Sequence, residues 1–83
     1  MAEERADIIF CIEPRNESHD INVPLDISAT DLVTGLNQAY SLGIDTTDIK
    51  KCVLKSERPI ALLKGSRTLQ DFGIRNGSIV YFT

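Results

Sequence analysis

The stretch of residues 65–83 reads GSRTLQDFGIRNGSIVYFT and carries strong signals of secondary structure. Its first part, residues 65–77, is rich in turn-forming residues and predicts an irregular segment. Its last part, residues 78–83, combines β-branched and aromatic side chains and predicts a strand. Asn76-Gly77, directly before that strand, is a strong signal for a tight turn. The sequence therefore predicts a final strand that is introduced by a tight turn.

The hydrophobic pattern upstream predicts further strands. Runs of β-branched residues or alternating apolar residues indicate strands at residues 7–13, 20–25, 52–55 and 60–64. Pro24 has no backbone N–H to donate to a neighbouring strand, so the second of these strands is expected at a sheet edge.

One helix is predicted between the second and third strands. Its apolar stripe consists of Leu32, Val33, Leu36 and Tyr40. Ser28 or Thr30 is the expected N-cap, and Gly43 is the expected left-handed residue at the C-terminal end. One helix covers only one face of a sheet, so we predict an α+β domain whose other sheet face is open.

The composition bounds the function. The 83 residues are 42% hydrophobic and 25% charged, which is ordinary for one globular domain. A domain of this size has little room for a deep active site, so we predict that it is not an enzyme. The net charge of −3 and the scattered basic residues argue against nucleic acid and anionic lipid as partners. The polar start and the lack of a long apolar run predict a cytoplasmic protein with no direct membrane insertion.

No catalytic, cofactor-binding or metal-binding residue is predicted. His19 lies among polar residues in an expected turn, where a solvated role is favoured over a catalytic one. Asp45 and Asp48 lack the further oxygen ligands that a calcium loop places at fixed spacing. Cys11 and Cys52 are interpreted as small apolar residues on strands, since a redox role would need a lowered thiol pKa.

The turn-rich segment GSRTLQDFGI, residues 65–74, resembles the ubiquitin-family pattern G-R-T-L-x-D-Y-x-I. Three longer segments resemble, element by element, the YukD-like or EsaB-like family, small ubiquitin-like proteins of the type VII secretion system of Gram-positive bacteria. These are DLVTGLNQAYSLGI (31–44), CVLKSERPIALLK (52–64) and RTLQDFGIRNGSIVYF (67–82). The resemblance implies a ubiquitin-like β-grasp domain over residues 7–83, after a polar N-terminal extension of residues 1–6. It implies a mixed sheet of four to five strands packed on one helix, with the fifth strand between the first and the third. It also implies that Leu69, Phe72 and Ile74 turn inward to close the core.

The resemblance further implies a non-enzymatic protein–protein interaction module, an accessory or regulatory component of a type VII secretion system. Its expected partners are other proteins, among them the cytosolic part of a secretion-system membrane protein. One alternative is a ubiquitin-like domain of a larger membrane transporter protein. Another is a carrier protein loaded at its C-terminus, if the natural chain is longer. The sequence ends in Tyr81-Phe82-Thr83 rather than Gly-Gly, so conjugation and sulfur carriage are disfavoured.

Strand alternation predicts the binding surface. Ile8, Phe10, Ile12, Val53, Val80 and Phe82 are expected to face the helix, because neighbouring side chains of a strand point to opposite faces. The open face is then expected to carry one apolar patch of Ile9, Cys11, Leu54, Ile79 and Tyr81. Large uncovered apolar patches are rare on monomers, and ubiquitin docks its partners on this same sheet face. We therefore predict that this patch binds proteins, with self-association included.

Overall fold

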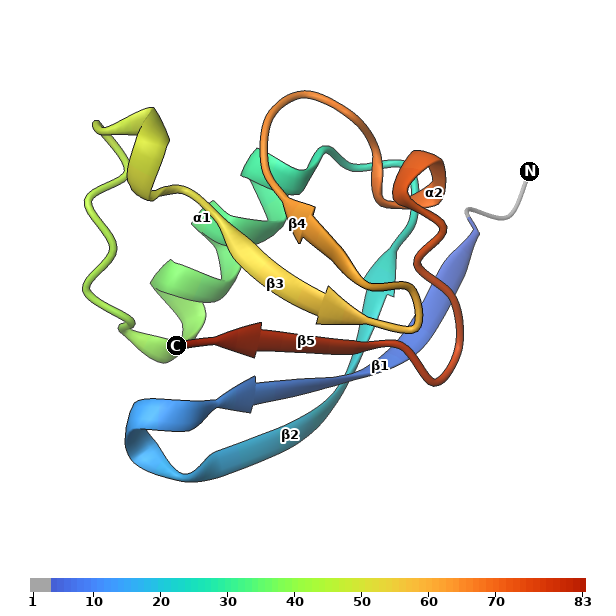
Figure 1. Ribbon diagram of the computed structural model, residues 1–83, viewed down its shortest axis with the longest axis horizontal. Helices are drawn as coiled ribbons and strands as arrows, with labels where there is room; N and C mark the ends of the chain where they lie inside the picture. Colours follow the sequence, from blue (N-terminus) through green and yellow to red (C-terminus); the bar gives the residue numbers. More distant parts are fainter. Residues whose placement is uncertain (1–3) are drawn as a thin grey trace.

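The computed structural model describes residues 4–83 and places one long helix behind a five-stranded sheet (Figure 1). The strand order is β2-β1-β5-β3-β4, with β1 parallel to β5 and the other neighbouring pairs antiparallel. The predicted α+β class and the place of the last strand between the first and the third are confirmed. The strands are β1 (Arg5–Ile12), β2 (Glu17–Pro24), β3 (Leu54–Glu57), β4 (Ala61–Leu63) and β5 (Ile79–Phe82). The helices are α1 (Ala29–Tyr40), α2 (Leu69–Phe72) and the single 3-10 turns η1 (Glu13–Arg15) and η2 (Ile49–Lys51).

The β1–β2 hairpin starts earlier and turns more tightly than predicted. β1 begins at Arg5, before the expected start at Asp7, and Ala6 is buried in the core. The predicted polar extension of residues 1–6 therefore overlaps the strand, and residues 1–3 lie outside the described residues. Asn16 follows η1 in the left-handed conformation, with φ of 54°, and the chain reverses there into β2. β2 lies at a sheet edge, as Pro24 predicted.

The helix α1 starts as predicted and ends earlier than predicted. Ser28 is its N-cap, and its hydroxyl oxygen accepts a hydrogen bond from the backbone N–H of Asp31 at 3.1 Å. The left-handed residue at the other end is Ser41, with φ of 53°, so the expectation that Gly43 ends the helix was wrong. The predicted apolar stripe faces the core, where Leu32 and Val33 are among its buried residues.

Arg15 of η1 provides an unpredicted cap for the C-terminal end of α1. Its guanidinium donates hydrogen bonds to the carbonyl oxygens of Tyr40, at 2.6 Å, and Ser41, at 2.5 Å. These carbonyls have no partner inside the helix, and the positive charge lies at the negative end of the helix dipole. The contact ties the β1–β2 turn to the far end of α1.

The turn-rich segment closes one end of the core as the resemblance implied. Leu69 and Ile74 are buried, and Phe72 is half-buried against the core. Thr68 caps the short α2, and Gly73 ends it with φ of 85°, which few residues other than glycine adopt at low cost. The guanidinium of Arg67 lies 5.0 Å from the centre of the Phe72 ring and covers this end of the core.

The side-chain direction predicted for β3 was wrong. β3 runs from Leu54 to Glu57 rather than over residues 52–55, and Leu54 is only 2% exposed because it points into the core. Cys52 is buried as well, with its sulfur 3.5 Å from the carbonyl oxygen of Asp48. Val53, expected to face the helix, is half-buried. Neighbouring side chains of a strand point to opposite faces, so with Leu54 and Ser56 buried, β3 presents Lys55 and Glu57 to the open side.

Candidate protein-binding face

The sheet face opposite α1 is built from rows of side chains that cross the strands. Residues paired on neighbouring strands point to the same side of a sheet, so the register defines these rows. The first row is Asp20, Ile9, Ile79 and Glu57. The second row is Ser18, Cys11, Tyr81, Lys55 and Leu62. Glu13 follows β1 on the same side as Cys11, and it lines the same groove as Tyr81.

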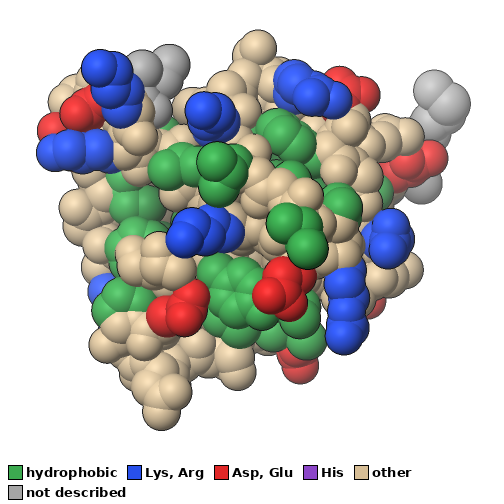
Figure 2. Space-filling model, viewed as in Figure 1, with side chains coloured by type: hydrophobic (Ala, Val, Ile, Leu, Met, Phe, Trp, Pro, Cys, Tyr) green, Lys and Arg blue, Asp and Glu red, His purple; other side chains and the backbone are tan. Residues whose placement is uncertain are grey.

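Four of the five predicted residues lie together in the middle of this face. We call them the apolar centre, which consists of Ile9, Cys11, Ile79 and Tyr81, and each of the four is half-buried. Leu54, the fifth predicted residue, lies in the core, and Lys55 takes its expected place beside Tyr81. Figure 2 shows this face, on which hydrophobic side chains form islands between single basic and acidic side chains.

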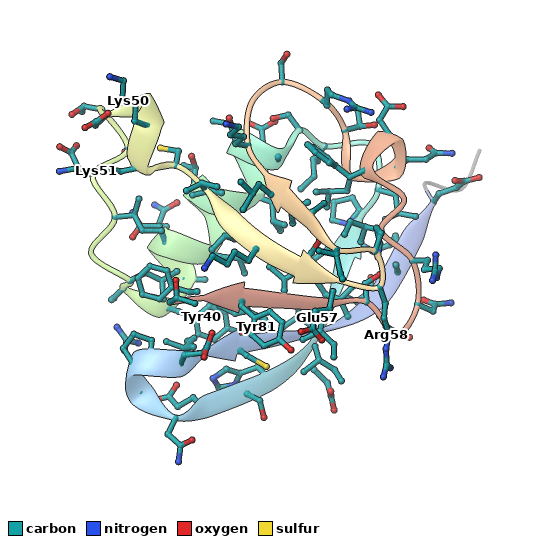
Figure 3. All side chains as sticks on the ribbon, in the orientation of Figure 1. Tyr40, Lys50, Lys51, Glu57, Arg58 and Tyr81 are labelled. Atoms are coloured by element: carbon teal, nitrogen blue, oxygen red, sulfur yellow. The ribbon has the colours of Figure 1, made fainter. Side chains whose placement is uncertain are left out.

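Tyr81 and Glu57 point to the same side of the sheet and lie close together (Figure 3). Partial burial raises the pKa of the Tyr81 phenol above its ordinary value. The hydrogen bond that its hydroxyl donates to Glu57 raises this pKa further, as do the negative charges of Glu57 and Glu13. The phenol therefore stays protonated at neutral pH and acts as a hydrogen-bond donor.

Cys11 lies beside Tyr81 in the same electrostatic environment. Burial raises the pKa of its thiol, and the carboxylates of Glu13 and Glu57 raise it further. The reactive form of a cysteine is the thiolate, so this environment favours the unreactive thiol at neutral pH. The interpretation of Cys11 as an apolar residue of the sheet is consistent with this shift.

A groove of about 500 Å³ adjoins the apolar centre on the side of β4. It is lined in part by Tyr81, Lys55, Ile60 and Leu62. Ile60 is 91% exposed and Leu62 is 51% exposed, which makes them the exposed large hydrophobic residues of the described chain. The sequence prediction assigned both to a strand without assigning them to the binding face. The pairing of Leu62 with Lys55 was the missing information, since it places Leu62 on the open side.

His19 lies on the helix side of the sheet, opposite this face. It lies in β2 rather than in the predicted turn, and its ring centre is 4.8 Å from that of Tyr40 on the helix side. Its Nε2 atom is 3.1 Å from a carboxylate oxygen of Glu17. This contact is local to β2, so the histidine contributes to packing around the end of α1.

The two aspartates of the connector after α1 are used in its turns. Asp45 accepts hydrogen bonds from the backbone N–H and the hydroxyl of Thr47, and these bonds lower the pKa of its carboxyl group. Asp48 accepts a hydrogen bond from the backbone N–H of Lys50 at 3.0 Å. Across residues 4–83, no three His, Cys, Asp or Glu side chains come together as a metal site would require.

The helices of the described chain are all too short or too polar to cross a membrane.

Comparisons with known proteins place the chain in a family and a fold. Residues 8–81 match the sequence profile of a family described as "WXG100 protein secretion system (Wss), protein YukD". No curated protein sequence matches the chain significantly. Among solved structures, the ubiquitin-like domain of tubulin-binding cofactor B is similar, with a TM-score of 0.75 and 18% identity. That match covers 96% of this chain and 89% of the other.

Two further ubiquitin-like domains have the same fold. The C-terminal domain of mouse tubulin-specific chaperone e matches with a TM-score of 0.71 and 10% identity, covering 98% of this chain and 87% of that one. The domain of yeast Ddi1 matches with a TM-score of 0.68 and 19% identity, covering 98% of this chain and 90% of that one. At these identities the likeness shows the ubiquitin-like fold alone.

Proposed function

Because this chain belongs to the YukD family of the WXG100 protein secretion system, we propose that it is a non-enzymatic, cytoplasmic component of such a system and binds its partner with the open face of its sheet. A ubiquitin-like domain is a protein-interaction module, and the family match runs from within β1 to within β5. The partner that fits this role is the cytosolic part of a membrane protein of the secretion system.

The observation that carries the proposal is the set of apolar side chains on the face that α1 leaves open. Ile9, Ile79 and Tyr81 occupy neighbouring positions on β1 and β5, and Leu62 lies in the second row beyond Lys55. Contiguous exposed apolar surface on a monomer is typical of interaction sites, because its burial against a partner is favourable. The place of these side chains on paired strands of the sheet supports a docking surface.

The chemistry of the same face supports binding rather than catalysis. Its candidate nucleophiles are the thiol of Cys11 and the phenol of Tyr81, and the pKa of each is raised above the ordinary value. An enzyme that used either group would need the opposite shift, since the deprotonated form attacks. Burial and the neighbouring carboxylates both raise the pKa values and so favour the protonated, unreactive form of the two groups.

The proposal is tested by site-specific photocrosslinking in cells that carry the secretion system. A photoreactive amino acid replaces Tyr81 on the open face or, as the matched control, Gln38 on the exposed side of α1. We expect position 81, and not position 38, to crosslink to a component of the secretion machine. Export of the WXG100 protein should also fall in Tyr81→Ala and not in Gln38→Ala. Equal crosslinking from both positions would contradict the proposed face.

A further inference from the structure

Three carboxylates border the apolar centre on three sides. We call them the acidic rim, which consists of Glu13, Asp20 and Glu57. We propose that the open face selects a partner segment in which an apolar side chain is flanked by lysines or arginines. This inference rests on the proposed docking function and adds the chemistry of the partner to it.

The strand register places each rim carboxylate. Asp20 pairs with Ile9 from β2, and Glu57 pairs with Ile79 from β3, so the first row holds two isoleucines between two carboxylates. Directly paired side chains in a sheet have Cβ atoms about 5 Å apart. Glu13 closes a third side, next to Tyr81 in the groove. An apolar anchor that rests on the centre therefore brings its own neighbours within reach of the rim.

The rim carboxylates lack cationic partners in the part of the chain that the structure describes. Within residues 4–83, a close contact between a carboxylate and a basic side chain is that of Glu17 with His19, on the helix side of β2 and away from the rim. Glu57 accepts a hydrogen bond from the Tyr81 hydroxyl, which leaves its negative charge in place. Lys55 lies on the fourth side, between Tyr81 and Leu62, and offsets one charge of three. Among these four charged side chains the surplus is negative, and a basic partner would neutralise it.

The field of the rim reaches the apolar centre. The carboxylates of Glu13 and Glu57 both contribute to the raised pKa of Cys11, and both contribute to the raised pKa of Tyr81. A negative potential of this kind attracts basic segments and disfavours acidic ones, nucleic acid and anionic lipid. The observations therefore favour a protein partner with positive charge next to its anchor.

The groove on the β4 side provides the space for an anchor. Its volume of about 500 Å³ exceeds that of a single leucine or phenylalanine side chain, so its apolar walls of Tyr81, Leu62 and Ile60 can accept such an anchor together with part of its own segment. The aliphatic part of Lys55 can lie along such an anchor while its ammonium group stays in water. The rim then determines which residues are favourable on either side of the anchor.

Two synthetic peptides test the inference by nuclear magnetic resonance titration of the full chain. Each peptide carries a Leu-Phe pair. In the arginine peptide two arginines stand on each side of this pair, and in the glutamate peptide two glutamates stand on each side. The rim variant carries Glu13→Gln, Asp20→Asn and Glu57→Gln. The matched control carries Glu4→Gln, Asp26→Asn and Asp71→Asn, which removes the same charge from exposed positions off the open face.

We expect the arginine peptide to shift the amide signals of Ile9, Cys11, Lys55, Ile79 and Tyr81. Its dissociation constant should rise about tenfold in the rim variant, as expected for three exposed charge contacts, and change less than about twofold in the control. Equal binding of both peptides on this face would overturn the rim inference while leaving the docking face intact. Shifts confined to α1 would overturn both proposals. An absence of shifts at millimolar arginine peptide would overturn the rim inference alone.

Discussion

Lys55 pairs directly with Tyr81 across β3 and β5, so an ammonium group and a phenol stand side by side on the open face of the sheet. Their chain neighbours Leu54 and Val80 point the other way and are almost completely buried. This pairing therefore determines which side chains of β3 and β5 pack in the core and which lie on the open face.

The pair Leu54 and Leu62 tests the observed side-chain directions. Leu54→Ala should lower the free energy of unfolding by about 2–5 kcal/mol, because it opens a cavity in the core. Leu62→Ala removes the same atoms from a side chain that is 51% exposed and should cost less than about 1 kcal/mol. Urea unfolding followed by circular dichroism measures both. Equal losses would contradict the direction assigned to β3.

Lys55 should limit self-association of the open face. Lys55→Leu joins the apolar centre to Leu62 and removes the charge between them, so we expect self-association to increase relative to the wild type. Lys64→Leu, at an exposed position just beyond β4, is the matched control. Sedimentation velocity over a range of concentrations reports the effect. An equal increase in the control would show that any added leucine has this effect.

Arg15 should stabilise the domain through the end of α1. Arg15→Ala removes two hydrogen bonds to helix carbonyls and a favourable charge, and we expect a loss of about 1 kcal/mol in the free energy of unfolding. Arg75→Ala, at another exposed arginine, should change stability by less than about 0.5 kcal/mol. Arg15→Lys keeps the positive charge but cannot bond both carbonyls with a planar guanidinium. We therefore expect it to lose less stability than Arg15→Ala. An Arg15→Ala protein with the same free energy of unfolding as the wild type would contradict the capping role.

The thiol of Cys11 should react with iodoacetamide only at elevated pH. Its folded-state pKa is raised, so the thiolate forms at a higher pH than in an unfolded chain. Replacing Glu13 and Glu57 by glutamine should lower that pKa and speed alkylation at a fixed pH near 8.5. Peptide mapping by mass spectrometry separates Cys11 from the buried Cys52. Unchanged alkylation in the variant would mean that the two carboxylates do not act on the thiol.

The raised pKa of Cys11 should also make the folded state less stable at high pH. When the folded-state pKa of an acid is raised, the unfolded chain loses the proton first as pH increases. The contribution of Cys11 to stability is therefore complete below its ordinary pKa of 9.0 and is lost above it. Thermal unfolding of wild type and Cys11→Ser between pH 7 and pH 10 measures this difference. The wild type should lose more stability over that interval than the variant.

Much of the fold followed from local sequence signals. The hydroxyl of Ser28 begins α1, Pro24 marks an edge strand, and the alternation in β1 sends Ile8 and Phe10 into the core. Each of these features depends on residues that are close in the sequence. The order of the strands came from the family resemblance, since local patterns do not determine which strands become neighbours.

The direction of β3 could not be read from its apolar residues alone. The run Cys52-Val53-Leu54 does not alternate, so it fits either face equally well. The charged residues Lys55 and Glu57 alternate with Ser56 and carried the better signal, because charges are costly to bury. Ser56 can be buried although it is polar, because its hydroxyl donates a hydrogen bond to the carbonyl oxygen of Pro59.

The parallel pairing of β1 with β5 has a consequence for how the chain reaches its native state. Ile9 and Ile79 come from opposite ends of the sequence, and their strands occupy the centre of the sheet. During synthesis on the ribosome the β1–β2 hairpin and α1 can form early, but the central pair must wait for the last strand to emerge. Contacts of such long sequence separation slow folding. Until β5 is in place, the nascent chain exposes the inner edge of β1, and that interval is when it is most open to misassembly.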